Sequence, residues 1–121
     1  MEKRLSEVEI KKLTKQAKVY IPARVEYFAQ IMGVHYDRVT IRHQKTRWGS
    51  CSSDKNLNFN CALMLMPKEV IDSVVVHELC HLRHMDHSKA FYAEVYKYCP
   101  DYKVWNKWLK DNGNEIISKL T

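Results

Sequence analysis

The sequence predicts an α+β domain with an N-terminal helix, a three-stranded antiparallel sheet and further helices after the sheet. Apolar residues first recur at helical steps of three and four, and then alternate with polar residues between positions 38 and 65. Helical spacing returns from position 67 onward, and no repeat or linker divides the chain. With 121 residues, 45% hydrophobic and 28% charged, the composition is that of a single folded domain over residues 1–121.

The first predicted helix covers residues 6–32. Ser6 is suited to the N-cap, and Gly33 follows the last apolar residue as a C-terminal stop. Pro22 lies inside the pattern and is expected to kink or divide the helix. The buried stripe comprises Ile10, Leu13, Ala17, Ile21, Val25, Phe28 and Met32.

Three strands are expected next, because apolar and polar residues alternate there. We predict strands at 38–42, 46–51 and 56–65, joined by turns at 43–45 and 52–55. Such short turns indicate an antiparallel meander, in which consecutive strands are neighbours. Gly49 inside the second strand indicates a bulge or a close approach of another group.

A helix over about 67–84 follows, with Pro67 in its first turn. Its buried side is expected to comprise Val70, Ile71, Val74, Val75, Val76 and Leu79. Ser88 can cap a later helix that ends at Cys99-Pro100, and Asp101 can cap another in which Val104, Trp105 and Trp108 pack inward. A break is predicted at 112–114.

A metal-binding motif lies in the central helix, where His77-Glu78-Leu79-Cys80-His81 has the pattern His-Glu-x-x-His. Residues four apart share one helical face, so His77 and His81 can bind one ion. Glu78 lies beside the first ligand, where a carboxylate can accept a proton from water. A catalytic zinc has three protein ligands and one open position, which predicts a third ligand nearby.

His84 and His87 are the candidates for that third ligand. Seven residues of helix rise roughly 10 Å, so His84 cannot share an ion with His77 if the helix continues that far. His87 avoids this objection if the helix breaks near Met85-Asp86 and the chain folds back. We therefore predict one zinc ion on His77, His81 and His87.

The net charge of +6 comes entirely from residues 1–47, which hold eleven Lys and Arg against five Asp and Glu. This region can attract nucleic acid or an acidic partner, or it can be the solvated face of a helix. No apolar run is long enough to span a membrane and no signal peptide is evident, so we expect a cytoplasmic protein. The four widely spaced cysteines are expected to be buried thiols without a second zinc site.

Taken together, these residues resemble the YgjP-like metallopeptidase family, a relative of the SprT-like and Wss1-type zinc proteases. The resemblance covers about residues 10–110 and rests on 44–52, on 67–88 and on the Pro100-Asp101-Tyr102 segment. Cys80 and Asp86 depart from the expected Ala and Asn. The resemblance implies a minimal zincin-like fold, with His77, His81 and His87 as zinc ligands and Glu78 as general base.

The expected function is zinc-dependent hydrolysis of peptide bonds in unfolded or extended protein segments. Arg47, His84 and Tyr92 are candidates for a second oxyanion donor, and Arg47 and Trp48 are candidates for the cleft wall. An exposed sheet edge can bind an extended peptide by strand addition. The alternatives are a protease module directed at DNA-bound proteins and a non-enzymatic zinc-binding interaction domain.

Overall fold

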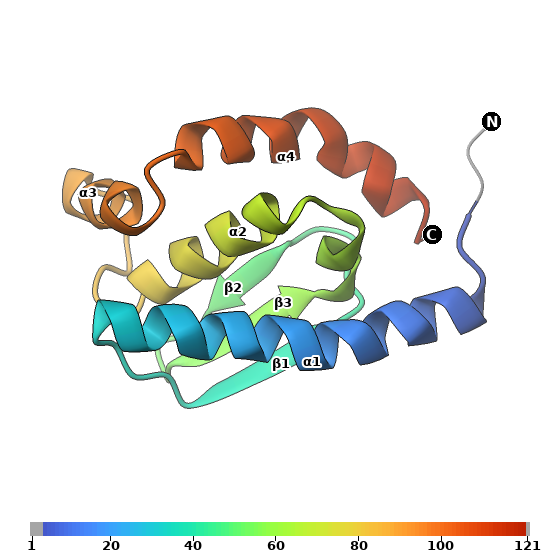
Figure 1. Cartoon of the computed structure of the whole chain (residues 1–121), viewed down its shortest axis with the longest axis horizontal. Helices are drawn as coiled ribbons and strands as arrows, with labels where there is room; N and C mark the ends of the chain where they lie inside the picture. The colour runs from blue at the N-terminus through green and yellow to red at the C-terminus, as the bar shows by residue number, and fades with distance from the viewer. Residues whose placement is uncertain (1–3, 121) are drawn as a thin grey trace.

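Four helices and a three-stranded sheet make up the described part of the chain in a computed structural model (Figure 1). It describes residues 4–120, so residues 1–3 of the basic region and residue 121 lie outside the described residues. The α+β fold class is confirmed. The elements are α1 (Glu7–Met32), β1 (Arg38–Arg42), β2 (Gly49–Cys51), β3 (Asn56–Asn60), the 3₁₀ helix η1 (Cys61–Leu65), α2 (Lys68–Cys80), α3 (Lys89–Tyr98) and α4 (Tyr102–Ser118).

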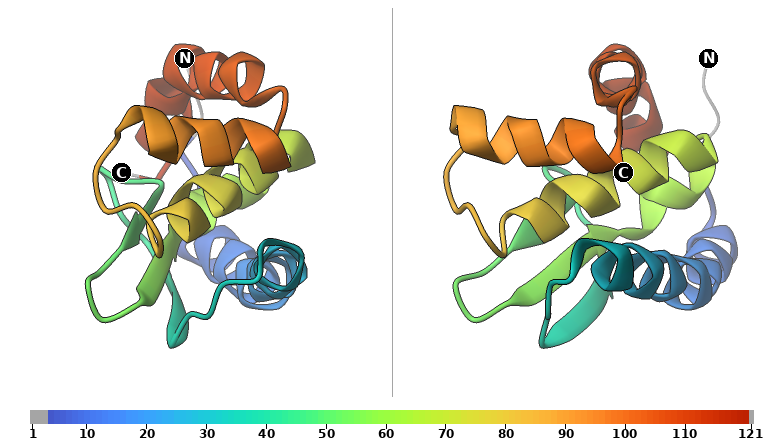
Figure 2. Two further views of the ribbon diagram at one scale, coloured as in Figure 1. Left: turned by 90° about the vertical axis from the view of Figure 1, so that its left-hand side faces the viewer. Right: turned by 60° about the vertical axis from the view of Figure 1, so that its left-hand side comes forward.

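The helix α2 lies in the middle of the fold. On one side it packs on α1 and the sheet, and on the other it is crossed by α4 (Figures 1 and 2). All six apolar residues predicted to form its buried side are indeed buried. Within residues 4–120, no helix combines the length and apolar character that crossing a bilayer requires.

The first helix begins and ends where its capping residues predict. Ser6 Oγ accepts the Glu9 N–H at 3.1 Å, and the Glu9 carboxylate accepts the Ser6 N–H at 3.0 Å, which forms a capping box. Gly33 ends the helix with φ of 69°, in the left-handed region that favours glycine. Pro22 was predicted to kink or divide the helix, and the structure excludes a divided helix, since α1 is continuous through it. A proline removes one hydrogen bond, and burial of Ile21 and Val25 on either side holds the helix together.

The sheet is mixed, so the predicted antiparallel meander is wrong. The strand order is β1-β3-β2, with β1 parallel and β2 antiparallel to β3. Strand β3 ends at Asn60, and the predicted strand residues 61–65 form η1 instead. Because β3 lies between β1 and β2, the chain between those two strands must cross about 10 Å over the end of β3. The crossing takes residues 43–48, not the short turn predicted at 43–45, and leaves only Gly49–Cys51 in β2.

The crossing loop is held by one buried side chain, that of Asn60 at the end of β3. Its Nδ2 donates to the carbonyls of Gln44 at 2.7 Å and Arg47 at 3.0 Å, while its Oδ1 accepts the Ala62 N–H at 2.9 Å. The Asn60 N–H also donates to the Trp48 carbonyl at 2.9 Å. Because Asn60 is 1% exposed, water cannot replace these bonds.

The C-terminal helix is longer than predicted. It runs from Tyr102 to Ser118 without the break expected at 112–114. Gly113 is buried there, and a β-carbon at this position would lie 3.0 Å from Cζ2 of Trp48. The glycine thus permits α4 to pack closely on the Trp48 ring. Trp105 and Trp108 pack against the core as predicted, but Val104 is 58% exposed, which contradicts the prediction for that residue.

We expect Asn60→Ala to lower the free energy of unfolding by about 3 kcal/mol, because two carbonyls and one N–H would lose their buried partner. Asn58→Ala on the same strand is the matched control. Its half-buried amide bonds only the side chains of Ser50 and Arg42, so the expected loss is about 1 kcal/mol. Urea unfolding measures both variants, and equal losses would contradict the role assigned to Asn60.

Candidate metal centre

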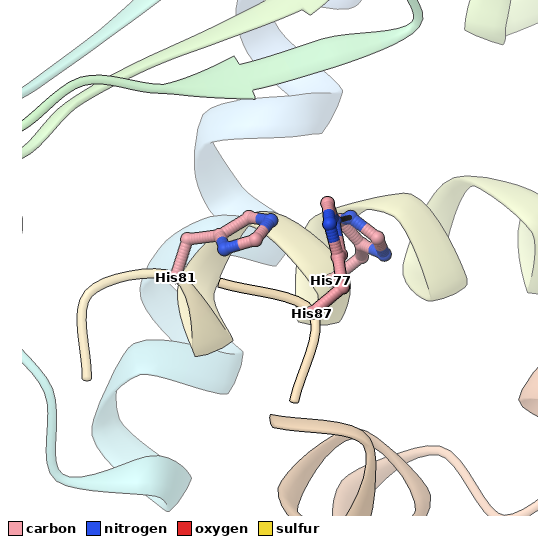
Figure 3. Close-up of side chains that lie close together, drawn as sticks. All are labelled: His77, His81 and His87. Carbon is pink, nitrogen blue, oxygen red and sulfur yellow. Dashed lines mark hydrogen bonds between the residues drawn. The ribbon is translucent and has the colours of Figure 1, made fainter. Parts of the chain in front are cut away.

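Three imidazoles converge at the C-terminal end of α2 (Figure 3). One ligand nitrogen each from His77, His81 and His87 lies within 4.8 Å of the others. The Nε2 atoms of His77 and His87 are 3.4 Å apart, close to the roughly 3.3 Å that separates two nitrogen ligands of a tetrahedral zinc. Within residues 4–120, no fourth His, Cys, Asp or Glu joins this group. The three side chains can hold a divalent metal and leave a coordination position open.

The local sequence explains how His87 reaches the other two histidines. The helix α2 ends at Cys80, four residues earlier than predicted, and His81 forms its C-cap. The chain then turns back, and Asp86 Oδ1 accepts the Ser88 N–H at 3.3 Å. Ser88 Oγ in turn accepts the Phe91 N–H at 3.2 Å, as the predicted N-cap of α3. His87 therefore lies between two local hydrogen bonds that fix its backbone.

A salt bridge anchors the same loop to the rest of the fold. Arg83 Nη1 donates to Glu94 of α3 at 2.7 Å. Its Nη2 donates to the carbonyls of Met32 at 2.6 Å and Gly33 at 3.3 Å, at the C-terminal end of α1. Carbonyls at a helix C-terminus lack intrahelical partners and attract cations, so the guanidinium is well matched to this position.

Two of the three imidazoles have a hydrogen-bond partner on the nitrogen that faces away from the group. His81 Nδ1 lies 2.9 Å from the His84 carbonyl, which can only accept. His81 Nδ1 must therefore carry the proton, which leaves the Nε2 lone pair for a metal. His77 Nδ1 lies 2.8 Å from the hydroxyl of Tyr102, at the start of α4.

The environment keeps the two helical histidines uncharged. Burial, followed by the neighbouring His81 and His87, lowers the pKa of His77 to about 4. Burial is also the main cause that lowers the pKa of His81. Both shifts favour the neutral ring, which is the form that binds metals.

Glu78 is buried next to the histidines, with 7% of its surface exposed. Strand β2 passes directly over it at Gly49, where a β-carbon would lie 3.0 Å from Glu78 Cγ and 3.2 Å from Oε2. The close approach predicted for Gly49 is thus an approach to this carboxyl group. Burial raises the pKa of Glu78 to about 8, and the charge of Arg47 opposes the rise. The pKa would fall beside a bound divalent cation, because opposite charge favours the carboxylate.

Two depressions meet at His77 and Glu78. One has a volume of about 190 Å³ and extends toward α4. It is lined by Arg47, Trp48, Gly49, Ser73, Val74, His77, Glu78, Tyr102, Asn106 and Leu109. The other, of about 350 Å³, lies between β2 and the three histidines. It is lined by Arg47, Gly49, Ser50, Cys51, His77, Glu78, His81, Met85 and His87.

The four candidate substrate contacts differ in where they lie. Arg47 lines both depressions and Trp48 lines the smaller one. His84 and Tyr92 line neither. The His84 ring lies 4.0 Å from the Glu94 carboxylate, and the Tyr92 ring stacks 6.2 Å from that of His87. Tyr102 was not predicted as a site residue, because no spacing links position 102 to the motif, although Tyr102 belongs to the Pro100-Asp101-Tyr102 segment that contributes to the resemblance.

The basic residues of the N-terminal region lie on the surface. The exposed ones among the described residues are Arg4, Lys11, Lys12, Lys15, Lys18, Arg38, Arg42, Lys45 and Arg47. Arg24 is half-buried and forms a bidentate pair with Asp72 of α2, at 2.9 and 3.0 Å. Only Arg47 of this set lines a depression beside the histidines. Nucleic-acid binding by this region stays a prediction.

Comparisons with known proteins give the family of the chain and similar folds. The family model described as "YgjP-like, metallopeptidase domain" matches residues 2–112. The metallopeptidase zymogen of Pyrococcus abyssi abylysin has a similar structure, with a TM-score of 0.66 at 23% identity over 75% of this chain and 93% of that one. The zymogen of Methanocaldococcus jannaschii jannalysin is similar with a TM-score of 0.61 at 19% identity, over 75% and 95% of the two chains. At these identities the likeness is one of fold. The comparison with curated protein sequences finds no match.

We expect His77→Ala, His81→Ala and His87→Ala each to lose tight zinc binding, because each removes one of three ligands. His84→Ala should keep zinc, since its ring lies outside the group and only its carbonyl bonds His81. Metal content after gel filtration and competition with a chelator measure the four variants. Retained zinc in His87→Ala together with loss in His84→Ala would overturn the assignment.

Proposed function

The chain belongs to the YgjP-like metallopeptidase family, and on this premise we propose that it is a zinc-dependent peptidase that cleaves unfolded or extended protein segments. The buried Glu78 beside the three histidines carries the proposal. A zinc site that only stabilises a fold is closed by four protein ligands and needs no carboxylate. Here three histidines and one buried carboxyl group meet in an accessible depression.

The residues fit zinc by donor type and spacing. Imidazole nitrogens are common zinc ligands, and His77, His81 and His87 would hold the ion. When bound, zinc acidifies a water molecule and polarises the carbonyl of the substrate. His87 is exposed, so the ion and the substrate can reach the site from solvent.

Glu78 would act as general base and then as general acid. Its carboxylate accepts a proton from the water that attacks the peptide carbonyl, and later delivers this proton to the leaving amine. Burial favours such proton transfer, because it brings the pKa of the carboxyl group closer to neutral pH.

The edge strand β2 would bind the substrate. It has β3 on one side only, and its three residues line the larger depression beside the histidines. An extended peptide can pair with such an edge through backbone hydrogen bonds, and this aligns its carbonyls beside the catalytic groups. A folded segment cannot pair in this way, which accounts for the proposed preference for unfolded substrate.

Arg47 is the proposed second contact to the substrate. It is exposed, lines both depressions and forms none of the ion pairs found among residues 4–120. A guanidinium there can stabilise negative charge that develops on the carbonyl oxygen during attack. The bonds from Asn60 to the loop carbonyls keep it close to the cleft.

We expect Glu78→Gln to bind zinc but to lose turnover by about 10²–10⁴-fold, because an amide cannot accept the proton. Cleavage of a reduced and alkylated unfolded protein by the zinc-loaded wild type measures this, with the variant purified identically. Equal cleavage by both proteins would indicate a contaminant or a wrong catalytic residue. Zinc binding without cleavage by either would favour the non-enzymatic interaction domain.

Gly49→Ala should lower turnover by roughly 10- to 100-fold while zinc affinity is retained. The added methyl group would press on Glu78 Cγ and Oε2 and displace the carboxylate, and a shift of about 1 Å has an effect of this order. Ser50→Ala in the same strand is the control, because its side chain bonds Asn58 and not Glu78. Similar turnover in both variants would contradict the role given to the contact.

A further inference from the structure

Tyr102 connects the metal centre to the helix that covers it. It is the first residue of α4 and lies 25 positions from His77 in sequence, yet its hydroxyl is 2.8 Å from His77 Nδ1. The tyrosine is buried, with 6% of its surface exposed. The two rings also stack, with centroids 5.9 Å apart and an angle of 23° between their planes.

The hydrogen bond has a defined direction once a metal is bound. His77 Nε2 faces the group of ligand nitrogens, 3.4 Å from His87 Nε2. A metal takes the Nε2 lone pair of a neutral ring, so the proton must be on Nδ1. Nδ1–H then donates to the Tyr102 oxygen. Without a metal the proton can lie on either nitrogen, and the hydroxyl can then donate or accept.

The start of α4 has no side-chain cap. Asp101 occupies the N-cap position, but its side chain makes no capping hydrogen bond. The Tyr102 N–H donates to the Cys99 carbonyl at 3.0 Å, and the Tyr102 ring packs against Tyr92 and Tyr96. The Tyr102 hydroxyl therefore makes a polar contact between the first turn of α4 and His77 of α2.

We propose that Tyr102 is a positioning residue that holds His77 for metal binding, and that metal binding in turn tightens the docking of α4. The proposal rests on the proposed metal site. A ligand that strengthens the His77–Tyr102 bond must favour docked α4, and docked α4 must favour the ligand by the same factor, because the coupling is reciprocal. The docking of α4 also affects the proposed substrate site, since Tyr102, Asn106 and Leu109 of α4 line the smaller depression.

Zinc affinity is the first test, with Tyr102→Phe compared with Tyr96→Phe. The first variant removes only the oxygen that contacts His77. The second removes a hydroxyl from a 40% exposed ring that touches Tyr102 edge-on. Partners of metal-bound histidines contribute about 10- to 100-fold in affinity, so Tyr102→Phe should weaken zinc by this factor and Tyr96→Phe by less than about twofold. Competition with a chromophoric chelator gives both values, and unchanged affinity in Tyr102→Phe would overturn the proposal.

Hydrogen exchange is the second test, and its first comparison uses the wild type alone. Amides of residues 102–109 should exchange more slowly when zinc is added to the wild type, and this response should be lost in Tyr102→Phe. Unchanged exchange in the wild type on zinc loading would overturn the coupling, even if the variant failed to fold. A residue with only a packing role would lower the stability of the metal-free protein but leave the stabilisation by zinc unaltered.

Neither measurement depends on peptide cleavage, so the two proposals can fail separately. Wild-type protein that binds no zinc would remove the proposed function and the inference together. Zinc bound with equal affinity by the wild type and Tyr102→Phe would remove only the inference. The coupling would be supported, and the peptidase rejected, if zinc slowed exchange in the wild type and bound Tyr102→Phe more weakly while no peptide was cleaved.

Discussion

The position at which α2 ends is the constraint on which the metal centre depends. A helix brings residues four apart to one face, but it carries residues seven apart too far along its axis to share an ion. Because α2 ends at Cys80, His81 at its C-cap still lies one turn after His77, and the following chain can fold back to His77. Ser88 and Arg83 stabilise this return through the cap of α3 and the end of α1. Helix geometry aligns two of the candidate ligands, and the end of the helix allows the third to join them.

Burial of a carboxyl group is the second constraint on the site. An unpaired carboxylate in a protein interior is unfavourable, so its pKa rises and it becomes able to exchange protons near neutral pH. Glu78 is buried because β2 crosses it at Gly49, and β2 can lie there because the loop before it is bound by Asn60. The burial of Glu78 thus depends on the position of β2, and the position of β2 depends on the hydrogen bonds of Asn60.

The C-terminal helix lies on the side of α2 opposite the sheet (Figure 1), and its residues line the smaller depression. It approaches closely because Gly113 has no side chain between α4 and the Trp48 ring. The hydroxyl of its first residue, Tyr102, lies 2.8 Å from His77 Nδ1, and Asn106 and Leu109 line the smaller depression. One element therefore contributes both to the shape of the proposed substrate site and to the surroundings of His77, which explains why metal affinity and cleft geometry should vary together.

The sequence alone determined the features that depend on neighbours along the chain. Capping by Ser6 and Gly33 set the ends of α1, and helical spacing aligned His77 with His81. The helix rise counted against His84 only if the helix reached residue 84, but α2 ends at Cys80, because turn formation after a helix depends on what the loop then contacts. His84 is nevertheless outside the group, and its carbonyl contacts His81 Nδ1.

Tertiary structure alone decided the pairing of the strands and the surroundings of the histidines. Alternating polarity identifies a strand but carries no information about its neighbour or direction, so the insertion of β3 between β1 and β2 was not predictable. The Asn-Gly-Asn segment of α4 indicated a break, yet close packing of Gly113 on Trp48 keeps the helix continuous. The packing of α4 on α2 also brings Tyr102 close to His77. Contacts between segments distant in sequence leave no periodicity, and only the packed fold brings them together.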